Sequence, residues 1–147
     1  MSTEQNKALV RRYFDALNTA WQTGDFSPLD RFLAADYVYY SEPEPIRGRD
    51  GFRALTGAYR AGFPDVRFNV EDVIAEGDQV LVRFTGVGTH QGEFLGIAPT
   101  GKKITVSVLD LLRLRDGQIV EDWERFDLLN MLQQLGAAPV PAAAQAT

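Results

Sequence analysis

Apolar residues recur at intervals of three and four between Leu9 and Trp21, while charged residues occupy the positions between them. This spacing predicts a helix with one buried face, and Gly24 marks its end. Two shorter periodic segments follow, over residues 27–33 and 50–63. We therefore expect three helices before the chain reaches residue 64.

The rest of the chain alternates between apolar and polar positions, which predicts strands. An aromatic segment at 36–40 forms a short strand, and two hairpins follow. Each hairpin turns at a Gly-Asp or Asp-Gly pair, and their strands are residues 67–76 with 79–87 and residues 103–115 with 118–126. The expected fold class is α+β, in which a curved antiparallel sheet wraps around three N-terminal helices as a conical barrel with a ligand pocket.

A length of 147 residues and an even composition predict one domain, over residues 1–136. Residues 137–147 are rich in Ala and Pro and predict a disordered tail. The chain has 20 acidic and 15 basic residues, a net charge of −5, which argues against a nucleic-acid partner. It lacks an apolar run of ~18 residues and a signal peptide, so we expect no membrane association and a cytoplasmic location.

Cysteine is absent, and His90 is the only histidine. This composition excludes a disulfide scaffold and a thiolate nucleophile, and it argues against a metal site built from several histidines. His90 lies in a segment rich in glycine. It either assists proton transfer or is a buried structural histidine.

The second hairpin places acidic residues among apolar ones, and its register decides which of them meet. A two-residue loop pairs Leu112 with Glu121, whereas a three-residue loop pairs Asp110 with Asp122. The second register joins the two apolar faces, so we predict it. Glu124 then lies one diagonal step away on the same face.

Carboxylates clustered on a pocket-facing surface are typical of general acid/base catalysis, because burial and neighbouring charges raise their pKa values. The alternative is that the end of the hairpin is solvated and carries ordinary surface acids. Arg113, Arg115 or Arg125 would then neutralise them. Spacing alone leaves both interpretations open.

Several segments also carry the landmarks of one family, and the most specific is THQGEFLGIAPTGKK, at residues 89–103. The others are residues 6–14, 34–38, 48–52, 63–65, 116–123 and 134–136. Over residues 4–136 the chain resembles the SnoaL-like polyketide cyclases of the nuclear transport factor 2-like superfamily. The resemblance implies the same conical α+β fold, a homodimer or higher homo-oligomer, and catalysis without metal or cofactor.

In these cyclases a carboxylate on the final strand is the acid/base of an intramolecular aldol ring closure. The matching position here is Glu124, where the family has aspartate. Asp110 and Asp122 stand where the family often has histidine, and Tyr39 matches a polar pocket residue. We therefore expect Glu124 to be the catalytic base, with Asp110 and Asp122 tuning it or donating as neutral acids.

The leading hypothesis is a cyclase or isomerase that acts on a small, apolar, polyketide-like carbonyl compound. The residues expected to line its substrate site are His90, Tyr39, Tyr13, Trp123, Phe126 and Phe63. Alternatives on the same fold are an enzyme similar to ketosteroid isomerase, with Tyr13 and Asp110 as donors, or one similar to an epoxide hydrolase. A third alternative is a binding module without catalytic activity.

Overall fold

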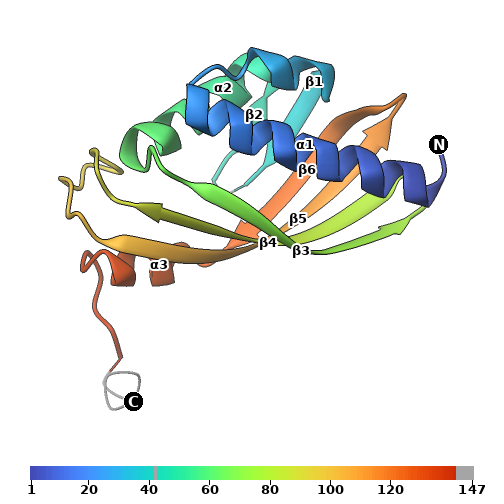
Figure 1. Cartoon of the computed structure of the whole chain (residues 1–147). Helices are drawn as coiled ribbons and strands as arrows, with labels where there is room; N and C mark the ends of the chain where they lie inside the picture. Colours follow the sequence, from blue (N-terminus) through green and yellow to red (C-terminus); the bar gives the residue numbers. More distant parts are fainter. Residues whose placement is uncertain (42, 142–147) are drawn as a thin grey trace.

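The computed structural model describes residues 1–41 and 43–141. Part of the predicted disordered tail, residues 142–147, lies outside the described residues. Helix α1 (Thr3–Thr23) runs along the inner face of a curved sheet (Figure 1). A capping box between Ser2 and Gln5 begins this helix, and Gly24, with a φ of 79°, ends it.

Three further helices surround the sheet: η1 (Ser27–Arg31), a 3₁₀ helix, α2 (Gly48–Gly62) and α3 (Leu128–Gln134). Helix α2 packs against β1 on the same side of the sheet as α1, whereas the short α3 lies beside β5 near the chain's C-terminal end (Figure 1). The expected layering of N-terminal helices over one face of a sheet is confirmed.

The described residues form a six-stranded sheet in the order β2-β1-β6-β5-β4-β3. Its strands are β1 (Leu33–Tyr40), β2 (Ile46–Arg47), β3 (Arg67–Glu76), β4 (Gln79–Thr89), β5 (Lys103–Arg115) and β6 (Gln118–Phe126). The sheet curves but does not close, so β2 and β3 remain its edges. Both predicted hairpins are present, as β3–β4 and β5–β6.

The sheet is mixed, which differs from the antiparallel sheet expected from the sequence. Strand β1 pairs with β6 in parallel, and Tyr39 lies opposite Asp122. A hairpin turn forces its two strands to be antiparallel, but no such turn joins β1 to β6. This pairing brings side chains from the first third of the chain next to those from the last.

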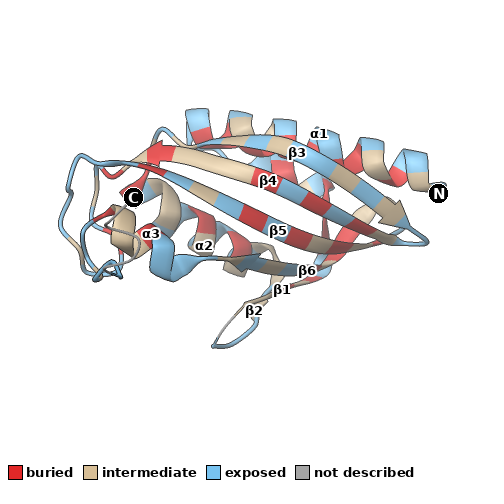
Figure 2. Cartoon of the chain, turned by 90° about the horizontal axis from the view of Figure 1, so that it is seen from below, coloured by how far each residue is buried: buried red, intermediate tan, exposed pale blue. Residues whose placement is uncertain are grey.

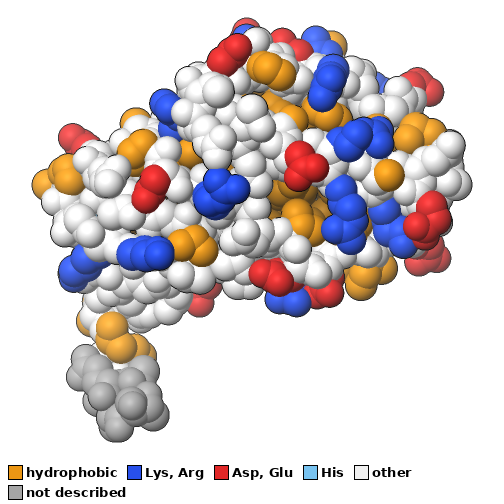
Figure 3. Space-filling view, in the orientation of Figure 1, with side chains coloured by type: hydrophobic (Ala, Val, Ile, Leu, Met, Phe, Trp, Pro, Cys, Tyr) orange, Lys and Arg blue, Asp and Glu red, His pale blue; other side chains and the backbone are white. Residues whose placement is uncertain are grey.

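Burial alternates along the long strands, as Figure 2 shows for β3 to β6. The inward residues pack against α1 and form the apolar core together with residues of the helices. On the face seen in Figure 3, acidic and basic side chains are interspersed. No helix of the described residues is long and apolar enough to cross a membrane.

Candidate active site

The β5–β6 hairpin turns at a two-residue loop, not at the predicted three-residue loop. Both loop residues, Asp116 and Gly117, have positive φ values, of 53° and 76°, as a tight hairpin turn requires. Next to this turn Leu114 pairs with Ile119, yet Arg113 pairs with Glu121. One residue of β6 therefore has no partner on β5, which is the definition of a β-bulge.

That bulged residue is Val120, and it is buried together with its neighbour Ile119. The bulge shifts the register, so that Asp110 lies opposite Glu124 and Leu112 opposite Asp122. The predicted direct pairing of Asp110 with Asp122 is therefore wrong. The predicted clustering holds, because the bulge turns Asp122 and Glu124 toward the inner face.

Two tyrosines of β1 hold the acids of β6 from the other side. The hydroxyl of Tyr37 donates to Oδ2 of Asp122 at 2.9 Å, and the hydroxyl of Tyr39 donates to Oε2 of Glu124. Both bonds follow from the parallel pairing of β1 with β6, since alternate residues of adjacent strands face the same side. Asp122 and Glu124 thus each have a phenol as a partner.

Burial raises the pKa of all three acids. Burial and the charge of Glu124 raise the pKa of Asp122 to about 8, against the effect of the hydrogen bond from Tyr37. The pKa of Asp110 is raised well above its usual range by burial and by the charges of its two neighbours.

Glu124 differs from the other two acids in its hydrogen bonds. Burial raises its pKa as well, but hydrogen bonds from Tyr39 and from Asp110 oppose the rise by stabilising the anion. Burial and neighbouring charge thus favour the protonated form of Asp110, whereas the hydrogen bond from Tyr39 favours the anion of Glu124. The pair forms an acid and a base side by side, the arrangement that proton transfer needs.

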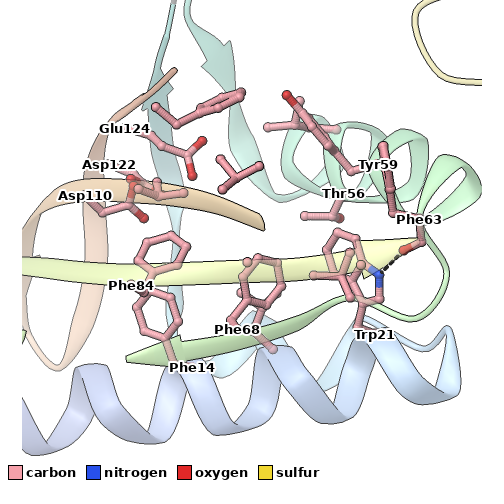
Figure 4. A pocket seen from close by; sticks show the side chains of 18 of the residues that line it. Phe14, Trp21, Thr56, Tyr59, Phe63, Phe68, Phe84, Asp110, Asp122 and Glu124 are labelled. Carbon is pink, nitrogen blue, oxygen red and sulfur yellow. Dashed lines mark hydrogen bonds between the residues drawn. The ribbon is translucent and has the colours of Figure 1, made fainter. Parts of the chain in front are cut away.

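These acids lie at one end of a cavity that opens to solvent. The close-up in Figure 4 shows them at one end, with Trp21 and Phe63 at the other. Aromatic rings form the floor between the two ends. The ring centroids of Phe84 and Phe68 lie 5.8 Å apart, and those of Phe68 and Trp21 lie 5.2 Å apart. The aromatic lining of the cavity suits a small, flat, largely apolar ligand.

Helix α2 closes the cavity opposite this floor. Phe52, Thr56 and Tyr59 are spaced by four and three positions, so they share one face of the helix, and all three line the cavity. Helix α1 contributes Tyr13, whose hydroxyl has no hydrogen-bond partner among the described residues. Burial, followed by the charge of Asp122, raises the pKa of Tyr13 well above its usual value, so this phenol remains a donor.

The structure brings most of the expected site residues together. Tyr13, Tyr39, Phe63 and Phe126 line the cavity with the three acids. Trp123 does not, which corrects that expectation. It lies on the outer face of β6, 41% exposed, and stacks on Tyr40 with ring centroids 4.0 Å apart.

His90 is fully buried and is not part of the cavity lining. Its ring stacks on Phe63, and its Nδ1 accepts a hydrogen bond from the backbone N–H of Thr100. This histidine therefore supports the wall of the cavity from behind. The geometry corresponds to the structural role considered for it and not to contact with a ligand.

Tyr37 is the residue that the sequence analysis missed. It is completely buried, and its hydroxyl donates a hydrogen bond to Asp122. Its spacing of two from Tyr39 puts both on one side of the strand, which is a signal that the sequence does contain. Among the described residues no group of three or more acids and histidines is arranged to hold a metal ion.

An open α+β cone with an apolar, acid-lined cavity defines a class of small-molecule enzymes and binding proteins. A profile of the SnoaL-like polyketide cyclases matches residues 11–135, and the chain belongs to this family. It is 28% identical over 142 residues to the aklanonic acid methyl ester cyclase DnrD of Streptomyces peucetius, with 92% of each chain covered. This relative supports a polyketide cyclase as the enzyme type.

Two solved structures share the fold. A candidate SnoaL-like polyketide cyclase from Jannaschia sp. CCS1 superposes with a TM-score of 0.84 at 29% identity, covering 93% of this chain and 95% of that one. AclR of Streptomyces galilaeus, described as a candidate hydroxylase, gives a TM-score of 0.81 at 33% identity, covering 94% and 100%. The fold is therefore shared by proteins to which different reactions are ascribed.

Proposed function

We propose that the protein closes a ring by an intramolecular aldol reaction on an apolar, polyketide-like ester, with Glu124 as the base and Asp110 as the acid. One observation carries this assignment. Glu124 accepts a hydrogen bond from Tyr39, lies opposite Asp110 on the adjacent strand and faces the cavity. In this assignment Glu124 is the ionised base and Asp110 is the neutral acid.

In the proposed reaction, Glu124 acts first as the base and Asp110 then acts as the acid. Glu124 removes a proton from the carbon next to the ester carbonyl, and the resulting enolate carbon attacks a ketone carbon of the same molecule. As the new C–C bond forms, Asp110 gives its proton to the ketone oxygen, which becomes a hydroxyl. A proton then passes from Glu124 to Asp110 along their hydrogen bond and restores both groups, so the product is an isomer of the substrate.

Phenols support the charges that develop on the substrate. Tyr13 lines the same end of the cavity, remains protonated and has no other partner among the described residues. Its hydroxyl is suited to donate to the enolate oxygen, where a positioned donor lowers the barrier most. The aromatic floor from Phe84 to Trp21 would hold a flat substrate in one orientation.

An ester suits this cavity better than a free acid. Three carboxyl groups line it, and no lysine, arginine or histidine among the described residues does, so a carboxylate substrate would be repelled. The name of the relative DnrD specifies a methyl ester of a polyketide acid. Aklanonic acid methyl ester is therefore the first substrate to test.

The decisive variant is Glu124→Gln, which keeps the shape of the side chain but removes the base. We expect a loss of turnover of 10²-fold or more, as for other general bases, with folding and ligand binding retained. Glu121→Gln is the matched control, because it removes the same charge from the outer side of β6. Full activity in Glu124→Gln would refute the assignment.

Mass spectrometry of the product separates this proposal from other reactions. Ring closure leaves the mass of the substrate unchanged, whereas a hydroxylation adds one oxygen atom. Binding of the ester without any product, in the wild type, would instead indicate a binding module. Each result identifies one of these three possibilities.

A further inference from the structure

The acid cluster lacks the partners that buried carboxylates normally have. Buried acids are usually paired with arginine, lysine, histidine or a metal ion. Here the cavity lining of the described residues contains no basic side chain. Oδ1 of Asp110 and Oδ1 of Asp122 make no hydrogen bond with any described residue, although each of the two residues is only 4% exposed.

A metal ion is not a suitable partner for these unpaired acids. The acids and histidines of the described residues nowhere converge in a metal-binding arrangement. Aromatic rings lie near the acids instead. The ring centroids of Tyr13 and Phe14 are 5.3 Å apart, and those of Phe14 and Phe84 are 4.7 Å apart. The negative faces of aromatic rings attract organic cations, and ammonium groups are recognised in this way.

We propose that the cavity binds aromatic ammonium ions. The carboxyl groups of Asp110 and Asp122 would turn their free oxygens toward the cavity and accept hydrogen bonds from the ammonium group, and the aromatic body would lie on the floor formed by Phe84 and Phe68. This inference goes beyond the proposed cyclisation and does not depend on it, since binding requires no turnover. Such amines would occupy the place of the substrate and compete with it.

Charge coupling gives the binding a characteristic pH dependence. The ionisable groups that face the ammonium site are the acids of β5 and β6 and three tyrosines, from α1, β1 and α2. They are Asp110, Asp122, Glu124, Tyr13, Tyr39 and Tyr59. A bound cation favours the ionised acids, so binding releases protons and strengthens as the pH rises. The tyrosines remain neutral because burial raises their pKa values, that of Tyr59 to about 12.

Three ligands of one shape test the proposal on the wild-type protein by isothermal titration calorimetry. They are 2-naphthylmethylamine, the neutral 2-naphthalenemethanol and the anionic 2-naphthoate. At about pH 8, where the amine is still a cation and the acids lose protons, we expect the amine to bind at least tenfold more tightly than the alcohol. We expect the naphthoate to bind more weakly than either.

At about pH 5.5 the acids hold more protons, and the preference for the amine should fall below about threefold. At pH 8 the heat of amine binding should also change with the ionisation enthalpy of the buffer, because protons are released. Equal or tighter binding of the alcohol at pH 8 overturns the proposal. So does tighter binding of the naphthoate, or an absence of amine binding at millimolar concentration.

Variants locate the ammonium group. Asp122→Asn should reduce the affinity for the amine about tenfold or more relative to the affinity for the alcohol, whose binding reports whether the cavity is intact. Glu121→Gln, on the outer side of the same strand, should leave both affinities unchanged. An equal effect of the two variants would place the cation outside the cavity and contradict the proposal.

Discussion

Asp122 couples the stability of the fold to pH, and Asp122→Asn tests this coupling without any substrate. The pKa of its carboxyl group rises from 3.8 in the unfolded chain to about 8 in the fold. Between these two values the folded protein holds a proton that the unfolded chain has released. The free energy of unfolding therefore falls as the pH rises, by about 1.4 kcal/mol per pH unit, and the stabilisation, fully present below 3.8, is lost above 8.

The whole gap of about four pKa units corresponds to on the order of 6 kcal/mol. Asp122→Asn removes this titration but keeps an oxygen that accepts from Tyr37. Between about pH 5 and 7 the stability of the variant relative to wild type should increase by about 3 kcal/mol. Surface acids with lowered pKa values, such as Asp65, change the stability only below their unfolded pKa, outside this range.

Urea denaturation at several pH values, followed by the fluorescence of the buried Trp21, measures these free energies. Glu121→Gln serves as the control, because it removes a carboxylate that is partly exposed and paired with Arg113. Its pH dependence should match that of the wild type. Parallel stability curves for Asp122→Asn and wild type would refute the assignment of a proton to the buried acid cluster.

Tyr39→Phe removes a hydrogen bond that lowers the pKa of Glu124. The acidic limb of the pH profile of kcat/KM should therefore move to higher pH, and an unchanged profile would contradict the role of Glu124 as base. Gly92→Ala should destabilise the protein by more than about 2 kcal/mol, since its Cβ would lie 1.9 Å from the carbonyl oxygen of Ala61. Gly57→Ala, in the open on α2, should instead stabilise it by about 0.5–1 kcal/mol, and thermal melts compare the two.

The alternation of residues in the second hairpin predicted its strands at their observed bounds, Lys103–Arg115 and Gln118–Phe126. The bulge at Val120 could not be predicted in this way. Its cost and benefit depend on how both strands pack against the helices, and a valine fits a regular strand equally well. The three acids were nevertheless expected on one face. The loop is one residue shorter than predicted and the bulge adds one unpaired residue, so the observed pairing is shifted by two positions, and a shift of two keeps each side chain on the same face.

The position of β1 illustrates a different limit. Its aromatic and β-branched residues predicted a strand, but nothing local specifies a neighbour 85 residues further along the chain. The link from Tyr37 to Asp122 therefore stayed hidden. The outward orientation of Trp123, in contrast, follows from its position between the inward-facing Asp122 and Glu124 on one strand, so the sequence did contain that signal. The family resemblance gave a role to the three acids and to Tyr39, but it gave none to Tyr37.

The parallel pairing of β1 with β6 also affects how the chain folds during synthesis. Until residues 118–126 leave the ribosome, one edge of β1 has no strand to pair with, because β2 occupies only the other edge. Contacts between such distant segments form slowly, and an open strand edge invites association with other chains. The long-range pairing that completes the acid cluster thus makes the nascent protein dependent on its last strand. A chain that stops before β6 would lack both the β1–β6 pairing and the site.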